Sequence, residues 1–343
     1  MTGRHLVAVD GFETPGQILG RLAWEYGMET TPDTVKRPAT LSGTGLDWRF
    51  IARSVGLAIV AGYALWYALH PWANDGYAYW SAWQGDLYRT SWPDVGYVYS
   101  PAFAQAIWPL TLAPFAVFWA ILVAVQSWCL VAIVGPVLGA VLLVVPWLPA
   151  GGWANPVVGT IGGGNITLVI AFVAVYGLRY PALWSIALLT KVTPGIGLLW
   201  FAVRREWRSL AIGLVVTAGI AAVSFVIAPH LWLEWAGTLV AASGADVRRV
   251  EPIMPLILGL RLPIAAALIA WGARKDRRWT VPIGVMLAQP DIGLGGFVVG
   301  LGVLVETFHG ERALGVLVGI GVPVVDGAPD VVIDERLNVI GGR

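Results

Sequence analysis

Charge is scarce in this sequence. Charged residues make up 13% of its 343 residues and hydrophobic residues 57%, whereas about a quarter of the residues in a soluble domain are charged. A soluble fold of this composition would leave large apolar patches in contact with water, and a lipid bilayer would cover them. The net charge is only +1, so no basic surface is available to displace counterions from a nucleic acid. The sequence therefore predicts a membrane protein with no nucleic-acid partner.

Metal ligands and familiar catalytic signatures are scarce as well. The single cysteine, Cys129, lies in an apolar run, which excludes a disulfide framework and a thiolate zinc site. The four histidines do not have the spacing of metal ligands. The chain contains no Walker loop, no Gly-x-Ser-x-Gly elbow and no His-Glu-x-x-His motif. We therefore expect no metal and no cofactor.

Long apolar runs, in contrast, occur from residue 54 onward. A helical span needs about 20 apolar residues, and several runs are shorter, so some must be tilted, broken or re-entrant. We predict an all-α, polytopic transmembrane helical bundle with about 8–10 membrane segments. The candidate segments are Ser54–Leu69, Ser100–Leu112, Pro114–Val134, Pro136–Leu148, Ile166–Leu178, Ala182–Val203, Leu210–Ile227, Pro252–Gly272, Val281–Val305 and Ala313–Val325. Residues 1–50 are expected to form a cytoplasmic extension, 51–325 the membrane domain and 326–343 a cytoplasmic tail.

Basic clusters in short loops predict how the bundle is oriented. Arg204–Arg208 and Arg274–Arg278 are rich in arginine, and such clusters favour the cytoplasmic side. The loop 71–99 contains Asp75, Asp86 and Asp94 against a single arginine, so we expect it on the outer face.

Arg179 adds a second basic residue close before the apolar segment Ala182–Val203. If Arg179 and Arg204 are both cytoplasmic, this segment must be a hairpin of two half-helices, bent at Thr193-Pro194-Gly195. A single kinked span is the alternative, since proline and glycine are tolerated where other parts of the protein cover the backbone. The sequence leaves both interpretations open.

The loop 71–99 has the highest density of candidate site residues. Asp75 and Tyr79 lie four residues apart and would share one face of a helix. A carboxylate just beyond a membrane span can activate a hydroxyl group, while aromatic rings stack on sugar faces. An interfacial belt of aromatics with solvated aspartates explains the same residues. The candidate substrate-binding residues of this region are Tyr79, Trp80, Asp86, Tyr88 and Tyr99.

Polar residues elsewhere complete the candidate site. Lys191 lies inside an apolar stretch, where a cation costs at least ~2.5 kcal/mol and usually faces a cavity or an anion. A lipid phosphate is its natural partner, although the side chain could also extend to the interface. Asn165 follows three glycines at the start of a span, where a polar headgroup could approach the backbone; a flexible helix connection is the alternative. Arg249, in a later outer loop, could bind a phosphate as a fork; a solvated loop is the alternative.

Taken in order, these motifs resemble glycosyltransferase family 87, the polyprenyl-phosphate-mannose-dependent mannosyltransferases of the GT-C superfamily. The resemblance extends from Arg53 to about Trp279. The motifs that support it are Asp75, Gly85-Asp86-Leu87-Tyr88, Tyr97-Val98-Tyr99-Ser100-Pro101-Ala102-Phe103, Pro109-Leu110-Thr111-Leu112-Ala113-Pro114, Gly164-Asn165, Lys191-Val192-Thr193-Pro194 and Arg204-Arg205-Glu206-Trp207-Arg208. The sequence departs from the family by lacking a glutamine before Asn165 and an aromatic-histidine pair after Pro290.

The resemblance implies a GT-C-like fold in the plasma membrane with an outer-face catalytic cavity. It implies a hexosyltransferase that uses a polyprenyl phosphate sugar, most often of mannose, and a glycolipid or glycan acceptor. By match to the family's motif, Asp75 would be the general base, and the cost of burying Lys191 suggests that it lies near the donor phosphate. Two rivals remain: a transporter or flippase for an anionic lipid-linked substrate, and an inactive GT-C-like accessory subunit.

Overall fold

The computed structural model describes residues 47–71, 74–88, 97–145, 155–244, 257–290 and 294–303. The chain divides into a first unit, Met1–Asp47, and a second unit that begins at Trp48 and contains every described helix. Within the described residues all regular elements are helices and none is a strand. The prediction of an all-α polytopic membrane protein is confirmed.

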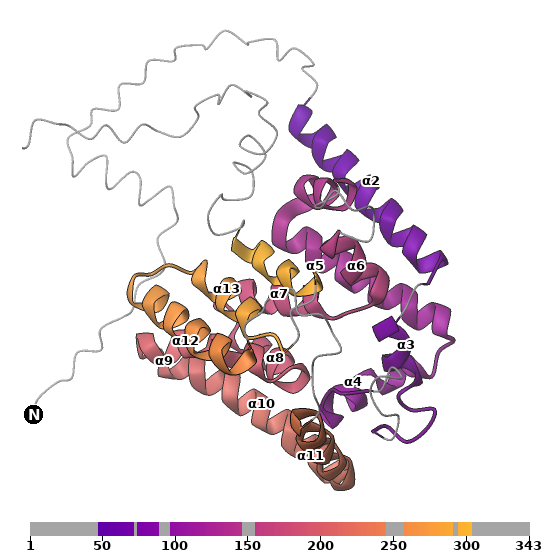
Figure 1. Cartoon of the computed structure of the whole chain (residues 1–343). Helices are drawn as coiled ribbons and strands as arrows, with labels where there is room; N and C mark the ends of the chain where they lie inside the picture. Colours follow the sequence, from indigo (N-terminus) through magenta and orange to yellow (C-terminus); the bar gives the residue numbers. More distant parts are fainter. Residues whose placement is uncertain are drawn as a thin grey trace, which may run out of the picture. The chain divides into compact units, whose positions relative to one another are not determined.

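Three described helices are long and apolar enough to cross a membrane: α2 (Trp48–Leu69), α5 (Phe115–Val144) and α10 (Trp207–Ile227). α2 lies along α5 (Figure 1), and a Cβ placed on Gly56 would lie only 2.7 Å from the carbonyl oxygen of Pro136. α5 contains a break at Gly135, whose φ of 77° suits glycine. The predicted segments Pro114–Val134 and Pro136–Leu148 therefore meet at this break.

The next two helices form a bent pair. α6 (Pro156–Gly163) and α7 (Thr167–Tyr176) meet at 113° and count as a fourth span only if taken together. Gly164 ends α6 with φ of 76°, a left-handed conformation that favours glycine. The chain thus turns sharply at Gly164-Asn165-Ile166, and the predicted span Ile166–Leu178 is one arm of the pair.

The segment after α7 is a hairpin of two broken arms. The first arm comprises the 3-10 turn η2 (Pro181–Leu183) and α8 (Trp184–Thr190), and the second η3 (Thr193–Leu198) and α9 (Leu199–Arg204). A Cβ placed on Gly195 would collide with Leu188, and one on Gly197 would collide with Trp184. The second arm therefore runs back along the first.

The two ends of this segment also meet, because Arg179 and Arg204 line the same cavity. Of the two interpretations that the sequence left open, the hairpin is the one observed. Its tip is Lys191-Val192, between α8 and η3.

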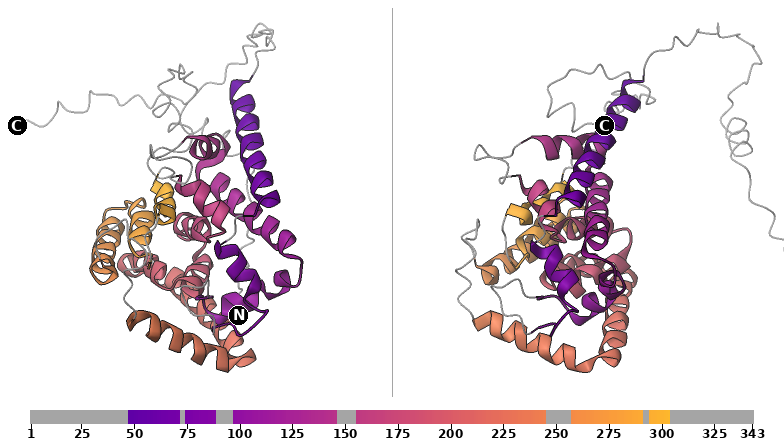
Figure 2. Two further views of the ribbon diagram at one scale, coloured as in Figure 1. Left: turned by 45° about the vertical axis from the view of Figure 1, so that its right-hand side comes forward. Right: turned by 90° about the vertical axis from the view of Figure 1, so that its right-hand side faces the viewer.

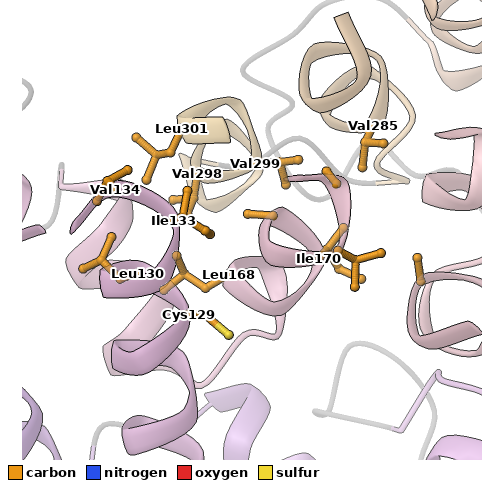
Figure 3. Packing of buried hydrophobic residues seen from close by; sticks show 14 of the residues in the cluster. Cys129, Leu130, Ile133, Val134, Leu168, Ile170, Val285, Val298, Val299 and Leu301 are labelled. Carbon is orange, nitrogen blue, oxygen red and sulfur yellow. The ribbon is translucent and has the colours of Figure 1, made fainter. Parts of the chain in front are cut away.

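The C-terminal described elements complete the core. α12 (Leu258–Arg274) packs against α9 and α13 (Thr280–Leu287), and η5 (Leu294–Leu301) packs against α7 and α13. Figure 3 shows side chains of α5, α7, α13 and η5 gathered in this core. The predicted segment Val281–Val305 is thus two separate elements, α13 and η5. Ala313–Val325 and the tail 326–343 lie outside the described residues.

Three further helices frame the candidate site: α3 (Asn74–Ser81), α4 (Pro101–Thr111) and α11 (Pro229–Gly244). Figure 2 shows α3 and α4 near the α11 end of α10. α4 has 11 residues, about 16 Å of helix, so the predicted segment Ser100–Leu112 is too short to span a bilayer by itself.

Candidate active site

Tight glycine packing fixes the position of α3. A Cβ placed on Gly76 would lie 2.5 Å from Cζ3 of Trp119, and one on Gly164 would lie 2.8 Å from the backbone nitrogen of Gly76. Trp119 Nε1 donates a hydrogen bond to the carbonyl oxygen of Tyr67 at 2.5 Å, which holds the indole in place. The first turn of α3 is therefore pressed against the bend between α6 and α7.

This packing leads to a stability prediction. Gly164→Ala should lower the free energy of unfolding by about 1–3 kcal/mol, because alanine is strained at positive φ and its Cβ would collide with Gly76 and Trp119. Gly163→Ala is the matched control, since Gly163 is helical and has no neighbouring atom where a Cβ would lie. Thermal unfolding of the purified protein in detergent measures both; an unchanged midpoint for Gly164→Ala would contradict the packing described.

Asp75 and Asn165 meet at this contact. Asn165 Nδ2 donates to Asp75 Oδ2 at 2.7 Å, and both residues are partly exposed. Asn165 Oδ1 accepts from the backbone N–H of Thr167 at 3.1 Å and from its hydroxyl at 2.5 Å. Because a backbone N–H can only donate, the amide oxygen must face Thr167 and the amide nitrogen must face Asp75. The start of α7 thus orients Asn165, and Asn165 orients the carboxylate.

A cluster of aromatic side chains packs against α3 one turn after Asp75. Tyr79 is 2% exposed and Tyr99 7% exposed; the Tyr79 hydroxyl donates to the Tyr99 hydroxyl at 2.9 Å. Tyr88 donates to the carbonyl oxygen of Tyr99 at 2.8 Å. Burial raises the pKa of Tyr79 and of Tyr97 well above the ordinary value, so both phenols stay protonated. The structure thus gives Tyr79 and Tyr99, expected from sequence to bind substrate, a packing role that holds α3 to the 97–101 segment.

The hairpin tip lies against this same segment. Ser100 caps α4, and its hydroxyl also donates to the carbonyl oxygen of Leu189, in the last turn of α8. Lys191 follows directly as the C-terminal cap of α8 and is partly exposed. One segment therefore holds two helix ends of the site. Ser100 contacts Leu189, two residues before Lys191, and Tyr99 contacts Tyr79, four residues after Asp75.

This segment and the basic turn lie at opposite ends of α10. Gln105 donates to the carbonyl oxygen of Ser224 at 3.3 Å, and Trp235 donates to that of Val98 at 3.1 Å. Arg204 and Arg205 lie just before α10 and Arg208 lies in its first turn. α10 has 21 residues, about 30 Å of helix. The two regions are thus separated by about the thickness of the apolar layer of a bilayer.

The remaining predicted site residues lie further from this contact. Trp80 donates to the carbonyl oxygen of Ala113 at 2.9 Å and packs on Phe115. Asp86 is exposed in the turn after α3. Arg249 lies outside the described residues. Among the residues that the structure describes, no group of three or more His, Cys, Asp or Glu could hold a metal ion.

One buried cation was not predicted. Arg261, on α12, is 5% exposed and donates to the carbonyl oxygens of Leu287, Gln289 and Pro290 at 2.8–3.1 Å. It therefore holds the end of α13, where the carbonyls have no helical partner. Arg261 could have been found from sequence, because it is a charged residue inside an apolar run. The energetic cost of burying such a residue is the reason that Lys191 was selected.

The model of glycosyltransferase family 87 matches residues 97–318, which is more than half of the chain. The chain belongs to glycosyltransferase family 87. Membership of family 87 indicates a membrane glycosyltransferase, and the resemblance drawn from the motifs is confirmed. No curated protein and no solved structure matches the chain.

The family 87 match includes the 97–101 segment, Asn165 and Lys191 but begins after Asp75. The match therefore says nothing about Asp75 directly. What relates Asp75 to the matched region is geometry: its hydrogen bond with Asn165, and the contact of Gly76 with Gly164.

Proposed function

We propose that this family 87 protein transfers a hexose, with mannose as the expected sugar, from a polyprenyl phosphate sugar to a glycolipid or glycan acceptor. Asp75 is the general base of this reaction. The observation that supports the proposal most directly is the hydrogen bond from Asn165 to Asp75. This bond joins Asp75, which lies outside the family match, to Asn165, which lies inside the match between the apolar helices α6 and α7.

The reaction needs only one carboxylate. Glycosidases need two, one of which protonates a poorly leaving alkoxide. A sugar phosphate leaves as a stable anion, so only the attacking hydroxyl group needs help. Asp75 accepts the proton of that hydroxyl, the acceptor oxygen bonds to the anomeric carbon, and the bond from this carbon to the phosphate oxygen breaks. Attack from the face opposite the phosphate inverts the configuration.

Lys191 stabilises the departing phosphate. A cation fixed where negative charge develops lowers the barrier most when water is excluded, and Lys191 is partly buried at the tip of the hairpin. We place this tip and Asp75 at the outer face of the plasma membrane, because the arginine-rich turn lies at the other end of α10 and such turns favour the cytoplasm.

The first experiment measures sugar transfer directly. Membranes that contain the protein are incubated with radiolabelled polyprenyl phosphate mannose and extracted for glycolipids and glycans. The proposal expects label in such a product, and more than in matched membranes that lack the protein. If the labelled donor only crosses the bilayer, the protein is a flippase. If the labelled donor is neither consumed nor moved across the bilayer, the protein is an inactive subunit. Either result contradicts the proposal.

Asn165 should act as a positioning residue. Asn165→Ala removes the donor that orients Asp75, and a misplacement of about 1 Å can cost roughly 10²-fold in rate. We expect kcat to fall by about 10- to 100-fold with little change in KM, because orientation of the base matters chiefly in the transition state.

A milder variant tests the same chain of contacts. Thr167→Val removes the hydroxyl but keeps the backbone N–H that Asn165 Oδ1 accepts, so its loss of kcat should be smaller. Steady-state kinetics on both variants measures the split between kcat and KM. A pure KM effect in Asn165→Ala would assign Asn165 to substrate binding instead.

A further inference from the structure

A cavity of about 250 Å³ lies at the open end of the hairpin, away from Lys191. Its charged lining comes from three separate turns. Arg179 lies between α7 and η2. Arg204 is the last residue of α9, and Glu206 lies between α9 and α10. Asp276 and Arg278 lie between α12 and α13. The proposed reaction gives this cavity no role.

The charges of the lining favour an anion. Arg204 donates from Nε to Glu206 at 2.6 Å and from a terminal nitrogen to Asp276 at 2.8 Å. Both acids of the cavity are thus paired with one arginine. The Arg179 guanidinium lies 5.4 Å from the centre of the Tyr180 ring, and in the described part of the chain neither Arg179 nor Arg278 has an ion pair. Three arginines against two acids leave the cavity positively charged.

Exposed aromatic side chains indicate the depth of this cavity in the membrane. Tyr180 is 51% exposed, Trp207 61% and Trp271 47%. Tyr180 follows Arg179 directly, Trp207 begins α10 and Trp271 lies in the last turn of α12. Tyrosine and tryptophan gather at the level of the lipid headgroups. Leu178 and Trp200 add an apolar wall beside the arginines. The cavity therefore combines cationic and apolar groups, as the headgroup end of a lipid would require.

We propose that this cavity binds the phosphate of an anionic lipid headgroup, with Arg179 and Arg278 as its ligands. Guanidinium groups match a phosphate in shape and charge and can bind it through two hydrogen bonds. Arg204 is already held by Glu206 and Asp276 and keeps the lining in place. A lipid bound here ties together the turns that open and close the hairpin, and so stabilises the hairpin whose tip contains Lys191.

Binding can be measured without any transfer assay, so this proposal stands or fails separately from the proposed function. The purified full-length protein in a neutral detergent is titrated with short-chain phosphatidylglycerol, short-chain phosphatidylcholine or inorganic phosphate, and its thermal unfolding midpoint is followed. We expect phosphatidylglycerol to raise the midpoint in a saturable way, because a ligand that binds only the folded state stabilises it. Phosphatidylcholine and inorganic phosphate should have much weaker effects at equal concentration.

Matched variants assign the effect to the cavity. Arg179→Gln and Arg278→Gln should each raise the half-saturating concentration of phosphatidylglycerol by about tenfold or more, since each removes charge-assisted hydrogen bonds. Arg277→Gln is the control, because Arg277 is exposed in the same turn but does not line the cavity. Unliganded midpoints close to that of the unaltered protein would show that the variants are folded.

Three results would overturn the assignment. Equal stabilisation by phosphatidylcholine would show that the anionic headgroup is not recognised, and equal stabilisation by inorganic phosphate would show that the lipid is not the ligand. A loss of affinity in Arg277→Gln as large as in Arg278→Gln would show a diffuse surface charge in place of a site.

Discussion

Asp75→Asn should abolish sugar transfer while the protein stays folded. A general base contributes typically 10²- to 10⁴-fold to a rate, so we expect kcat to fall by at least about 10²-fold. Asparagine has nearly the shape of aspartate, and its side-chain oxygen can still accept the hydrogen bond from Asn165 Nδ2. The measurement is transfer from radiolabelled polyprenyl phosphate mannose, together with the thermal unfolding midpoint.

Asp86→Asn is the matched control for this variant. Asp86 is the other acidic residue among the candidates from sequence. It is exposed in the turn after α3, whereas Asn165 of the family-matched region donates to Asp75. We expect Asp86→Asn to retain most of the activity. If Asp86→Asn were inactive and Asp75→Asn active, the two carboxylates would have to exchange roles.

Lys191→Met should reduce kcat by about 10²- to 10³-fold, the range for loss of one group that stabilises developing charge. Methionine keeps the length and apolar character of the side chain but removes its charge. A lysine that served only the fold would behave differently: removing a cation from an apolar segment lowers a burial cost, so folding would improve and turnover would be unaffected. Single-turnover kinetics and thermal unfolding, measured on the same preparation, separate the two roles.

Two further variants sharpen the test of Lys191. Lys191→Arg keeps the charge and should retain more activity than Lys191→Met, although a guanidinium differs in shape from an ammonium group. Lys275→Met removes an exposed lysine in the turn after α12 and should leave transfer unchanged. Full activity in Lys191→Met would remove Lys191 from the phosphate site.

Much of the fold follows from the sequence because apolar runs and arginine-rich turns obey strong physical constraints. The helices α2, α5 and α10 lie close to their predicted positions, since about 20 apolar residues have few alternatives to a span. The sequence predicted the bend at Thr193-Pro194-Gly195, whereas the tip observed is Lys191-Val192, and Thr193-Pro194-Gly195 begins η3. Whether the bend produced a kink or a hairpin depended on contacts between Leu188 and Gly195 and between Trp184 and Gly197, which local sequence does not specify.

The sequence predicted individual residues of the candidate site, but it did not predict which of them lie close together in the fold. Asp75 and Asn165 were each identified from sequence, yet 90 residues separate them. The fit of Gly76 against Gly164 and Trp119 brings them together. Tyr79 and Tyr99 are aromatic residues of the kind that stack on sugars, but the Tyr79 hydroxyl donates to the Tyr99 hydroxyl inside a buried cluster. Composition predicts which side chains gather, whereas burial depends on how the elements pack.

The central claim, that the candidate active site faces the opposite side of the membrane from the arginine-rich turn, is tested most directly by labelling single cysteines in intact cells. The substitutions Gln84→Cys, beside α3, and Arg208→Cys, at the start of α10, both replace exposed residues. The unaltered chain is the background control, because its Cys129 is buried. We predict that a membrane-impermeant thiol reagent labels Gln84→Cys from outside and labels Arg208→Cys only after permeabilisation. Labelling of both positions from the same side would contradict the account.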